Sequence, residues 1–321
     1  MNENMPAGGG SAFGGKIVFF GTSNVALPIL ESLNRHHQVL AVVTQPDAKV
    51  GRRQEIKESP VSVLAKEMQL KILKPSRVKD NLEFYQQLQS LGAEIFIVVS
   101  YGKILPLEII NLPKYKTLNV HFSLLPEYRG ASPIQSALLN GDSETGATIF
   151  ILDKKIDNGP IIAQEKVAID NDDNYISLSE KLSFLSAKLL ITVLPSYING
   201  SIGQTPQDEL RASYTKIITK EDGRIDWQKS ARKIYNQFRA FYPWPGIWTK
   251  WNGKILKITD CLPIDYSKTE GLPGTTSNGG IVNCGDNTSL QIKSLQLAGK
   301  AETKILDFLN GYQQFIGSRL E

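Results

Sequence analysis

The sequence contains little of the residue chemistry that metal centres and disulfide frameworks require. Its 321 residues include only two cysteines, Cys261 and Cys284, and three histidines. Two isolated cysteines cannot build a disulfide framework, so they predict small buried thiols. No HExxH, CxxC or GxxxxGK[ST] pattern occurs. We therefore expect neither a catalytic metal nor a P-loop.

Long apolar segments and targeting signals are also missing. No uninterrupted apolar run reaches the roughly 18 residues needed to cross a bilayer. Residues 1–15, MNENMPAGGGSAFGG, lack the basic and apolar regions of a signal peptide and predict a disordered extension. Together these features predict a cytoplasmic location.

The net charge of +4 is small, but it is unevenly placed. Residues 207–321 carry 16 Lys and Arg against 12 Asp and Glu, whereas residues 1–206 carry 20 of each kind. The whole positive excess therefore lies in the last third of the chain. It fits either a surface that meets a polyanion or an ordinary solvated surface.

Apolar strand-like runs alternate with amphipathic helical runs over the first 200 residues. The expected strands include residues 16–22, 39–45, 93–100 and 118–120, and helices are expected after the first two of these. Residues 46–59 are polar and predict a long loop. This alternation predicts an α/β, Rossmann-like domain with a mostly parallel sheet, whose ligands bind beyond the carboxyl ends of the strands.

The pattern changes near residue 201. One helix at 230–241 is followed by short strand-like runs such as KILKITD and SLQIKSLQL, which predict a small β-barrel or sandwich. We therefore expect four segments: a disordered extension at 1–15, a catalytic domain at 16–200, a linker at 201–210 and a smaller domain at 211–321.

Asn119 and His121 are the first candidate catalytic residues. They are two positions apart in NVHFSLLPEYRG, so both side chains leave one side of an extended chain. An amide and an imidazole side by side suit a developing oxyanion. His36 and His37 lie in a polar turn and predict an exposed loop.

A carboxylate partner is expected from residues 146–162, GATIFILDKKIDNGPII. This stretch offers Asp153 and Asp157, and Asp157 lies in an Ile-Asp-Asn-Gly turn. The sequence spacing does not establish that either reaches His121. If Asp157 does, it could hold the imidazole or accept a proton while an amine of a second substrate attacks a carbonyl.

Two loops are candidates for binding. The turn formed by Ser123, Leu124, Leu125 and Pro126 could pair its backbone groups with an amide-like heterocycle. The basic loop with Arg52 and Arg53 could contact phosphates. For both, a plain surface loop is the alternative.

These stretches together resemble the 10-formyltetrahydrofolate-dependent formyltransferases. NVHFSLLPEYRGASPIQ and GATIFILDKKIDNG resemble two signatures of that family. Four further stretches resemble the members that act on methionyl-tRNA: FGTSNVALPIL, TQPDAKVGR, KEDGRIDW and RAFYPWPGIW. The resemblance covers about residues 16–320. Phe122 stands where the family usually has proline, and Gln54 and Glu55 stand where basic residues are common.

The resemblance implies a Rossmann-like formyltransferase domain followed by an OB-like, tRNA-binding domain. Formyl transfer from 10-formyltetrahydrofolate, used as a co-substrate without a metal, to the α-amino group of methionyl initiator tRNA would then serve translation initiation. The implied roles are catalysis for Asn119, His121 and Asp157, folate binding for Ser123–Pro126, and tRNA contact for Arg52 and Arg53. We expect a monomer.

Other members of the family pass the formyl group to different acceptors. The glycinamide ribonucleotide enzymes are single-domain and shorter, so the C-terminal part of this chain argues against them. A hydrolase relative and an aminosugar formyltransferase also carry a similar C-terminal domain. A non-catalytic nucleotide- or RNA-binding protein is the alternative from another class, but the first turn, GTSNVA, is no GxGxxG.

Overall fold

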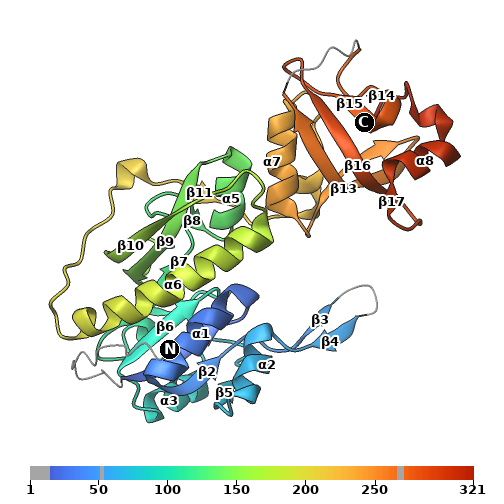
Figure 1. Ribbon diagram of the computed structural model, residues 1–321. Coiled ribbons are helices and arrows are strands. Elements are labelled where there is room, and N and C mark those ends of the chain that lie inside the picture. The colour runs from blue at the N-terminus through green and yellow to red at the C-terminus, as the bar shows by residue number, and fades with distance from the viewer. Residues whose placement is uncertain (1–14, 51–53, 266–270) are drawn as a thin grey trace, which may run out of the picture. The chain divides into compact units, whose positions relative to one another are not determined.

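A computed structural model describes residues 15–50, 54–265 and 271–321 (Figure 1). Its contacts divide the chain into two compact units. The first contains the chain up to Arg129, Gly146–Lys166 and Glu180–Ser213; the second contains Gly130–Thr145, Val167–Ser179 and Tyr214–Glu321. The predicted domain boundaries remain a prediction.

The α-helices of the described residues lie as follows: α1 Leu27–His36, α2 Pro60–Glu67, α3 Leu82–Ser90, α4 Leu107–Ile110, α5 Pro133–Asn140, α6 Tyr175–Ile198, α7 Ala231–Phe241 and α8 Ile305–Gly311. The strands are β1 Lys16–Gly21, β2 Gln38–Val43, β3 Ala48–Val50, β4 Glu55–Lys57, β5 Ile72–Leu73, β6 Ile95–Val99, β7 Thr117–His121, β8 Arg129–Gly130, β9 Glu144–Ile151, β10 Ile161–Ala168, β11 Tyr214–Thr215, β12 Ile247–Trp251, β13 Lys254–Ile264, β14 Thr276–Ser277, β15 Ile281–Asn283, β16 Ser289–Leu297 and β17 Thr303–Lys304.

The central sheet has seven strands in the order β10-β9-β7-β6-β1-β2-β5. Strands β5, β2, β1, β6 and β7 pair in parallel, and β9 runs antiparallel to β7. The chain moves outward from β1 to β2 and β5, then returns to β6 on the other side of β1. Parallel pairing brings the carboxyl ends of β1, β6 and β7 to one edge, where this class of sheet binds its ligands.

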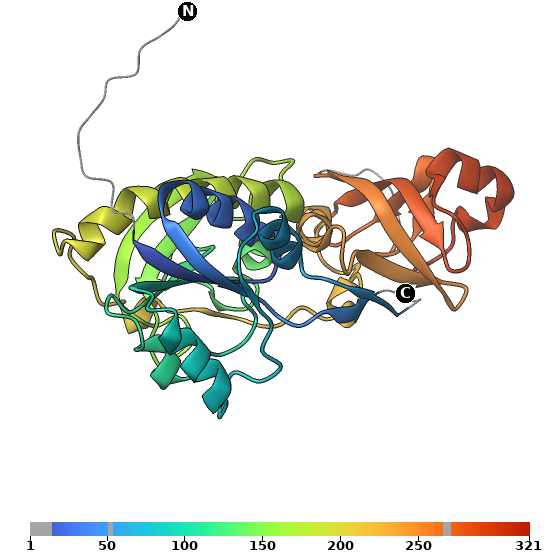
Figure 2. The same cartoon turned by 90° about the horizontal axis from the view of Figure 1, so that it is seen from below.

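Helices cover both faces of the sheet. Figure 2 shows α3 on one side of β1 and β2, and α1 and α6 on the other. Alternation along β1 explains this, because Val18 and Phe20 join a buried cluster with Phe84 and Leu88 of α3. Being apolar on both faces, β6 is buried along its whole length and β1 from Ile17 onward, as the sequence predicted.

Local signals start the helices where the sequence expected them. Ser59 accepts a hydrogen bond from the backbone N–H of Ser62 at the start of α2, and Pro60 follows it. Asn81 does the same for Phe84 at the start of α3. These caps satisfy N–H groups that have no partner within the helix.

Helix α6 is the one described helix long and apolar enough to suit a membrane span, with a mean hydropathy of 1.3 over its best window. In the structure it has two different sides. Leu182, Leu190 and Leu194 are fully buried, whereas Phe184 is 59% exposed. The helix therefore packs one face into the interior of the protein, as amphipathic helices of globular domains do.

The C-terminal unit is built on a separate antiparallel sheet. Strands β12, β13, β16, β15 and β14 follow one another, with β17 beside β16, and α5 packs on α7. Cys261 and Cys284 are buried in this unit, which confirms the prediction of buried thiols. Burial raises the pKa of Cys284 to about 12 and also raises that of Cys261. The predicted fold class is confirmed.

The segment predicted as a long loop, residues 46–59, was assigned wrongly. It contains β3 and β4, which pair antiparallel with Lys49 opposite Ile56. Each strand has only three residues and polar neighbours, so no hydrophobic period marks it in the sequence. Arg52 and Arg53 lie outside the described residues.

Removing a buried side chain from α6 should cost far more stability than removing an exposed one. Leu190→Ala should lower the free energy of unfolding by about 2–5 kcal/mol, because it leaves a cavity in the core. Phe184→Ala, on the exposed side, should change it by about 0.5 kcal/mol. Urea denaturation of both variants measures this, and equal losses would contradict the burial of this face.

Candidate active site

Strand β7 carries Asn119 and His121 to the edge of the sheet where β1 and β6 also end. The two residues are two positions apart, so their side chains share one face. His121 is the last residue of the strand and is almost fully buried. Its ring lies edge to face with the ring of Phe150 on β9, and the two ring centroids are 6.5 Å apart. The sequence prediction of a histidine at a strand end is confirmed.

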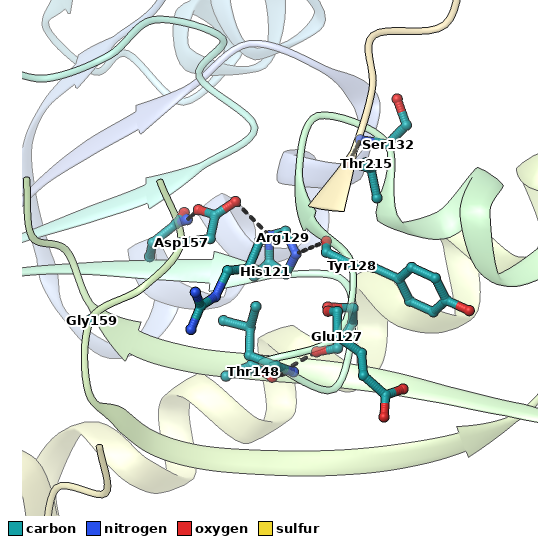
Figure 3. A network of polar contacts seen from close by, with 12 residues as sticks. His121, Glu127, Tyr128, Arg129, Ser132, Thr148, Asp157, Gly159 and Thr215 are labelled. Atoms are coloured by element: carbon teal, nitrogen blue, oxygen red, sulfur yellow. Dashed lines mark hydrogen bonds and ion pairs between the residues drawn. The ribbon is translucent and has the colours of Figure 1, made fainter. Parts of the chain in front are cut away.

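Both ring nitrogens of His121 face oxygen atoms. Nε2 lies 2.9 Å from the backbone carbonyl of Tyr128, and Nδ1 lies 3.6 Å from Oδ2 of Asp157 (Figure 3). A carbonyl oxygen only accepts, so Nε2 must carry a hydrogen. In neutral His121 the lone pair of Nδ1 would then face the carboxylate. Nδ1 is therefore the ring nitrogen of His121 that faces Asp157.

Asn119 and His121 converge on the same carboxylate. The amide Nδ2 of Asn119 donates to Oδ1 of Asp157 at 3.5 Å, close to the 3.6 Å between His121 and Oδ2. Side chains of His121 and Asp157 are 6% and 13% exposed. Both contacts are longer than an ordinary hydrogen bond of about 2.7–3.2 Å.

The loop of residues 152–160 turns back on itself to present Asp157. Asp157 adopts a φ of 48°, a left-handed conformation that Asp tolerates better than most residues. Gly159 is required for a different reason, because a Cβ there would lie 1.8 Å from the carbonyl oxygen of Ile151.

The second candidate carboxylate, Asp153, braces the same loop. Its Oδ1 accepts from the backbone N–H of Lys155 at 2.9 Å, and its Oδ2 accepts from Asn158 Nδ2 at 3.4 Å. The tertiary structure thus distinguishes the two carboxylates that the sequence left as alternatives. Asp157 faces the histidine, and Asp153 shapes the turn.

The turn after β7 is fastened by Thr148 of β9. The Thr148 hydroxyl donates to the Ser123 carbonyl at 2.6 Å and accepts from the Leu125 N–H at 3.1 Å. The Leu125 carbonyl accepts from Gln164 Nε2 at 2.9 Å, and Ser123 is fully buried. The backbone groups of Leu125, which the sequence suggested could pair with a heterocycle, are therefore bonded within the protein. A role in folate binding for Ser123–Pro126 remains a prediction.

Sequence reasoning missed three residues that surround the site: Arg129, Gln207 and Ser213. Arg129 is fully buried and its guanidinium donates to Gln207 and Glu209. Gln207 lies 50 residues beyond Asp157 along the chain, inside the predicted linker. No local pattern could have shown that these residues meet, although the Arg-Gly pair at the end of the first motif marked a position worth testing.

Metal ligands do not gather in the part of the chain that the structure describes. No group of three or more His, Cys, Asp and Glu residues there could hold a metal ion.

Two family models match most of the chain. Formyl transferase matches residues 15–194, and Formyl transferase, C-terminal domain, matches residues 217–313. A Caldicellulosiruptor saccharolyticus protein named methionyl-tRNA formyltransferase is 43% identical over 304 residues, covering 92% of this chain and 97% of its own. The chain belongs to the methionyl-tRNA formyltransferase family. The resemblance read from the sequence motifs is confirmed.

Other relatives agree with this membership. The methionyl-tRNA formyltransferase of Sulfurihydrogenibium is 40% identical over 312 residues, with 95% of this chain and all of its own covered. An N-formyltransferase from Helicobacter canadensis, solved with folinic acid and dTDP-3-aminofucose, has a TM-score of 0.63 at 23% identity. The match covers 86% of this chain and 98% of that one. At that identity it shows the shared fold alone.

A methyl group at position 159 should disturb the loop that presents Asp157. Gly159→Ala should lower stability by about 1–3 kcal/mol, because the backbone must move away from Ile151. Gly203→Ala is the matched control, since no described atom lies within 4 Å of a Cβ there. Thermal denaturation compares the two. Equal melting temperatures would show that residues 152–160 shift at no cost.

Proposed function

We propose that the chain transfers the formyl group of 10-formyltetrahydrofolate to the α-amino group of methionyl initiator tRNA, through Asn119, His121 and Asp157. The observation that carries the proposal is the convergence of these three side chains at the carboxyl end of β7. It occurs in a chain whose family is named for this activity.

Asn119 and His121 supply the hydrogen-bond donors. As the amine attacks the formyl carbon, negative charge develops on the formyl oxygen. Asn119 Nδ2 and, in its protonated form, His121 Nδ1 point toward one place, where they can stabilise this charge. The Tyr128 carbonyl keeps the imidazole in the orientation that directs Nδ1 there.

Asp157 supplies the base. Its carboxylate lies between the two donors in the resting state and is partly exposed, so a substrate oxygen can compete for those donors. The attacking nitrogen becomes positively charged as its bond to carbon forms. Asp157 then accepts its proton, directly or through one water. As the bond between the formyl carbon and the folate nitrogen breaks, protonated His121 can give the proton on Nδ1 to that nitrogen.

The formyl donor is a reduced folate in this proposal, used as a co-substrate. The Helicobacter canadensis relative was solved with a folate compound. In this chain the turn Ser123–Pro126 next to His121 is the candidate binding element, with Leu124 its least buried member. Because Leu125 already uses both backbone groups, the ligand must bond to the second lone pair of the carbonyl or to neighbouring groups.

The tRNA partner accounts for the uneven charge. The excess of positive charge lies in residues 207–321, where phosphate contacts would hold the tRNA and weaken as salt rises. Arg52 and Arg53 are candidates for a further contact. A cytoplasmic location, a monomeric state and a reaction without metal complete the proposal.

A transfer assay tests the function. Purified protein, 10-formyltetrahydrofolate and methionyl initiator tRNA should yield formylmethionyl-tRNA, and Asp157→Asn, which keeps the shape but loses the base, should yield almost none. Formate without formylated tRNA would instead indicate a hydrolase. Transfer to an aminosugar nucleotide but not to tRNA would indicate an aminosugar enzyme.

Removing the amide donor should slow the reaction strongly. Asn119→Ala should lower kcat by about 100- to 1,000-fold, the usual loss for one oxyanion donor. Asn111→Ala is the control, because Asn111 is exposed and its side chain bonds to Leu107 and Lys116. Steady-state kinetics of both variants decide the role, and a loss below about 10-fold for Asn119→Ala would contradict it.

A further inference from the structure

Residues 205–213, here termed the strap, run beside both loops that present the catalytic groups. Thr205 exchanges two backbone hydrogen bonds with Ile161, at 2.8 and 2.9 Å, just after the loop of Asp157. At the other end, Ser213 bonds to the loop of residues 122–129. The strap therefore joins two loops that are far apart in the sequence.

Gln207 holds the loop that carries Asp157. Its Nε2 donates to the carbonyl of Asp157 at 2.9 Å and to the carbonyl of Gly159 at 2.8 Å. Its Oε1 accepts from Arg129, at 3.1 Å from Nε and 2.8 Å from Nη2. Both N–H groups and the oxygen of the Gln207 amide are thus hydrogen-bonded. This fixes the orientation of the amide, with its nitrogen toward the loop of Asp157 and its oxygen toward Arg129.

Arg129 holds Gln207 in turn. Its side chain is fully buried, and a second pair of bonds at 3.1 Å joins it to both carboxylate oxygens of Glu209. These hydrogen bonds hold the pKa of Glu209 below its usual value. A buried guanidinium is costly unless its donors are satisfied, so Arg129 favours the one strap conformation that satisfies them.

Ser213 acts on the other catalytic loop. Its Oγ accepts from the Tyr128 N–H at 2.8 Å, its carbonyl accepts from the Arg129 N–H at 2.8 Å, and its N–H donates to the Pro126 carbonyl at 3.2 Å. The Tyr128 carbonyl is the group that accepts from His121 Nε2. One strap therefore reaches Asp157 through Gln207 and His121 through Ser213 and Tyr128.

We propose that the strap is part of the active site and that Gln207 and Ser213 are positioning residues. They fix Asp157 and His121 relative to each other, so that donor and base keep their geometry during formyl transfer. This inference rests on the function proposed above. Displacement of a catalytic group by about 1 Å can cost on the order of 100-fold in rate.

The contrary interpretation is that residues 205–213 only connect two parts of the chain. Substitutions there would then alter stability or the KM for tRNA and leave kcat unchanged. The two interpretations differ in kcat, and a variant that keeps the fold can separate them.

Gln207→Glu provides that variant. One carboxylate oxygen can still accept from Arg129, so the buried guanidinium stays paired. The other oxygen meets the carbonyls of Asp157 and Gly159 and cannot donate to them. We expect kcat to fall about 10- to 100-fold, as far as in Gln207→Ala, with KM for tRNA and folate within about 2-fold of wild type.

The matched control is Gln204→Ala, which removes an exposed glutamine next to the strap. It should keep the wild-type kcat and melting temperature. Wild-type kcat in Gln207→Glu and Ser213→Ala would overturn the proposal. A raised KM for tRNA with unchanged kcat would do so as well, and would assign the strap to tRNA binding.

A second measurement does not depend on turnover. The chain has only three histidines, so ¹⁵N-detected NMR of their side chains gives few signals, and His121→Gln assigns the one from His121. We expect the His121 signal to be displaced in Ser213→Ala and Gln207→Glu, while the signals of His36 and His37 remain unchanged.

The two measurements separate the two proposals. If wild type forms no product but the His121 signal moves in both variants, the strap positions the histidine and the proposed function is wrong. If product forms and neither kcat nor the His121 signal changes in the variants, the function stands and the strap proposal is wrong.

Discussion

The carbonyl oxygen of Tyr128 can only accept a hydrogen bond, and much of the site depends on that constraint. It places a hydrogen on Nε2 of His121 and turns Nδ1 toward Asp157. Asn119 then meets the same carboxylate from β7. The three side chains to which the proposal gives catalytic roles are thus gathered at one carboxylate.

This arrangement requires support because the two loops on which it depends have no regular secondary structure apart from Arg129, the first residue of β8. Residues 152–160 place Asp157 in a left-handed conformation, and residues 122–129 place a backbone carbonyl against a ring nitrogen. Strand β9 fastens the second loop through Thr148, while Gln207 and Arg129 fasten the first. Rigid support of this kind is what preorganised catalysis needs, since a site that shifts loses its electrostatic advantage.

Regular elements were predictable where one local signal determined them. The strand at residues 16–22 was found at Lys16–Gly21 and that at 93–100 at Ile95–Val99, because inner parallel strands are apolar on both faces. The short pair β3 and β4 was missed, since three-residue strands with polar neighbours have no such signal. Residues 205–210 of the strap were assigned to a linker for a related reason, because a polar segment with proline and glycine nearby has the composition of a connection. Residues 211–213 were assigned to the C-terminal domain.

The sequence by itself determined the α/β class, the family, the position of His121 at a strand end and the pairing of Asn119 with it on one face. These follow from periodicity and from motifs that lie within a few residues of each other. The tertiary structure decided that Asp157 and not Asp153 faces the histidine, and that Gln207, Arg129 and Ser213 hold the loops. Such contacts join residues up to about 85 positions apart. Only the folded sheet brings them within hydrogen-bonding distance.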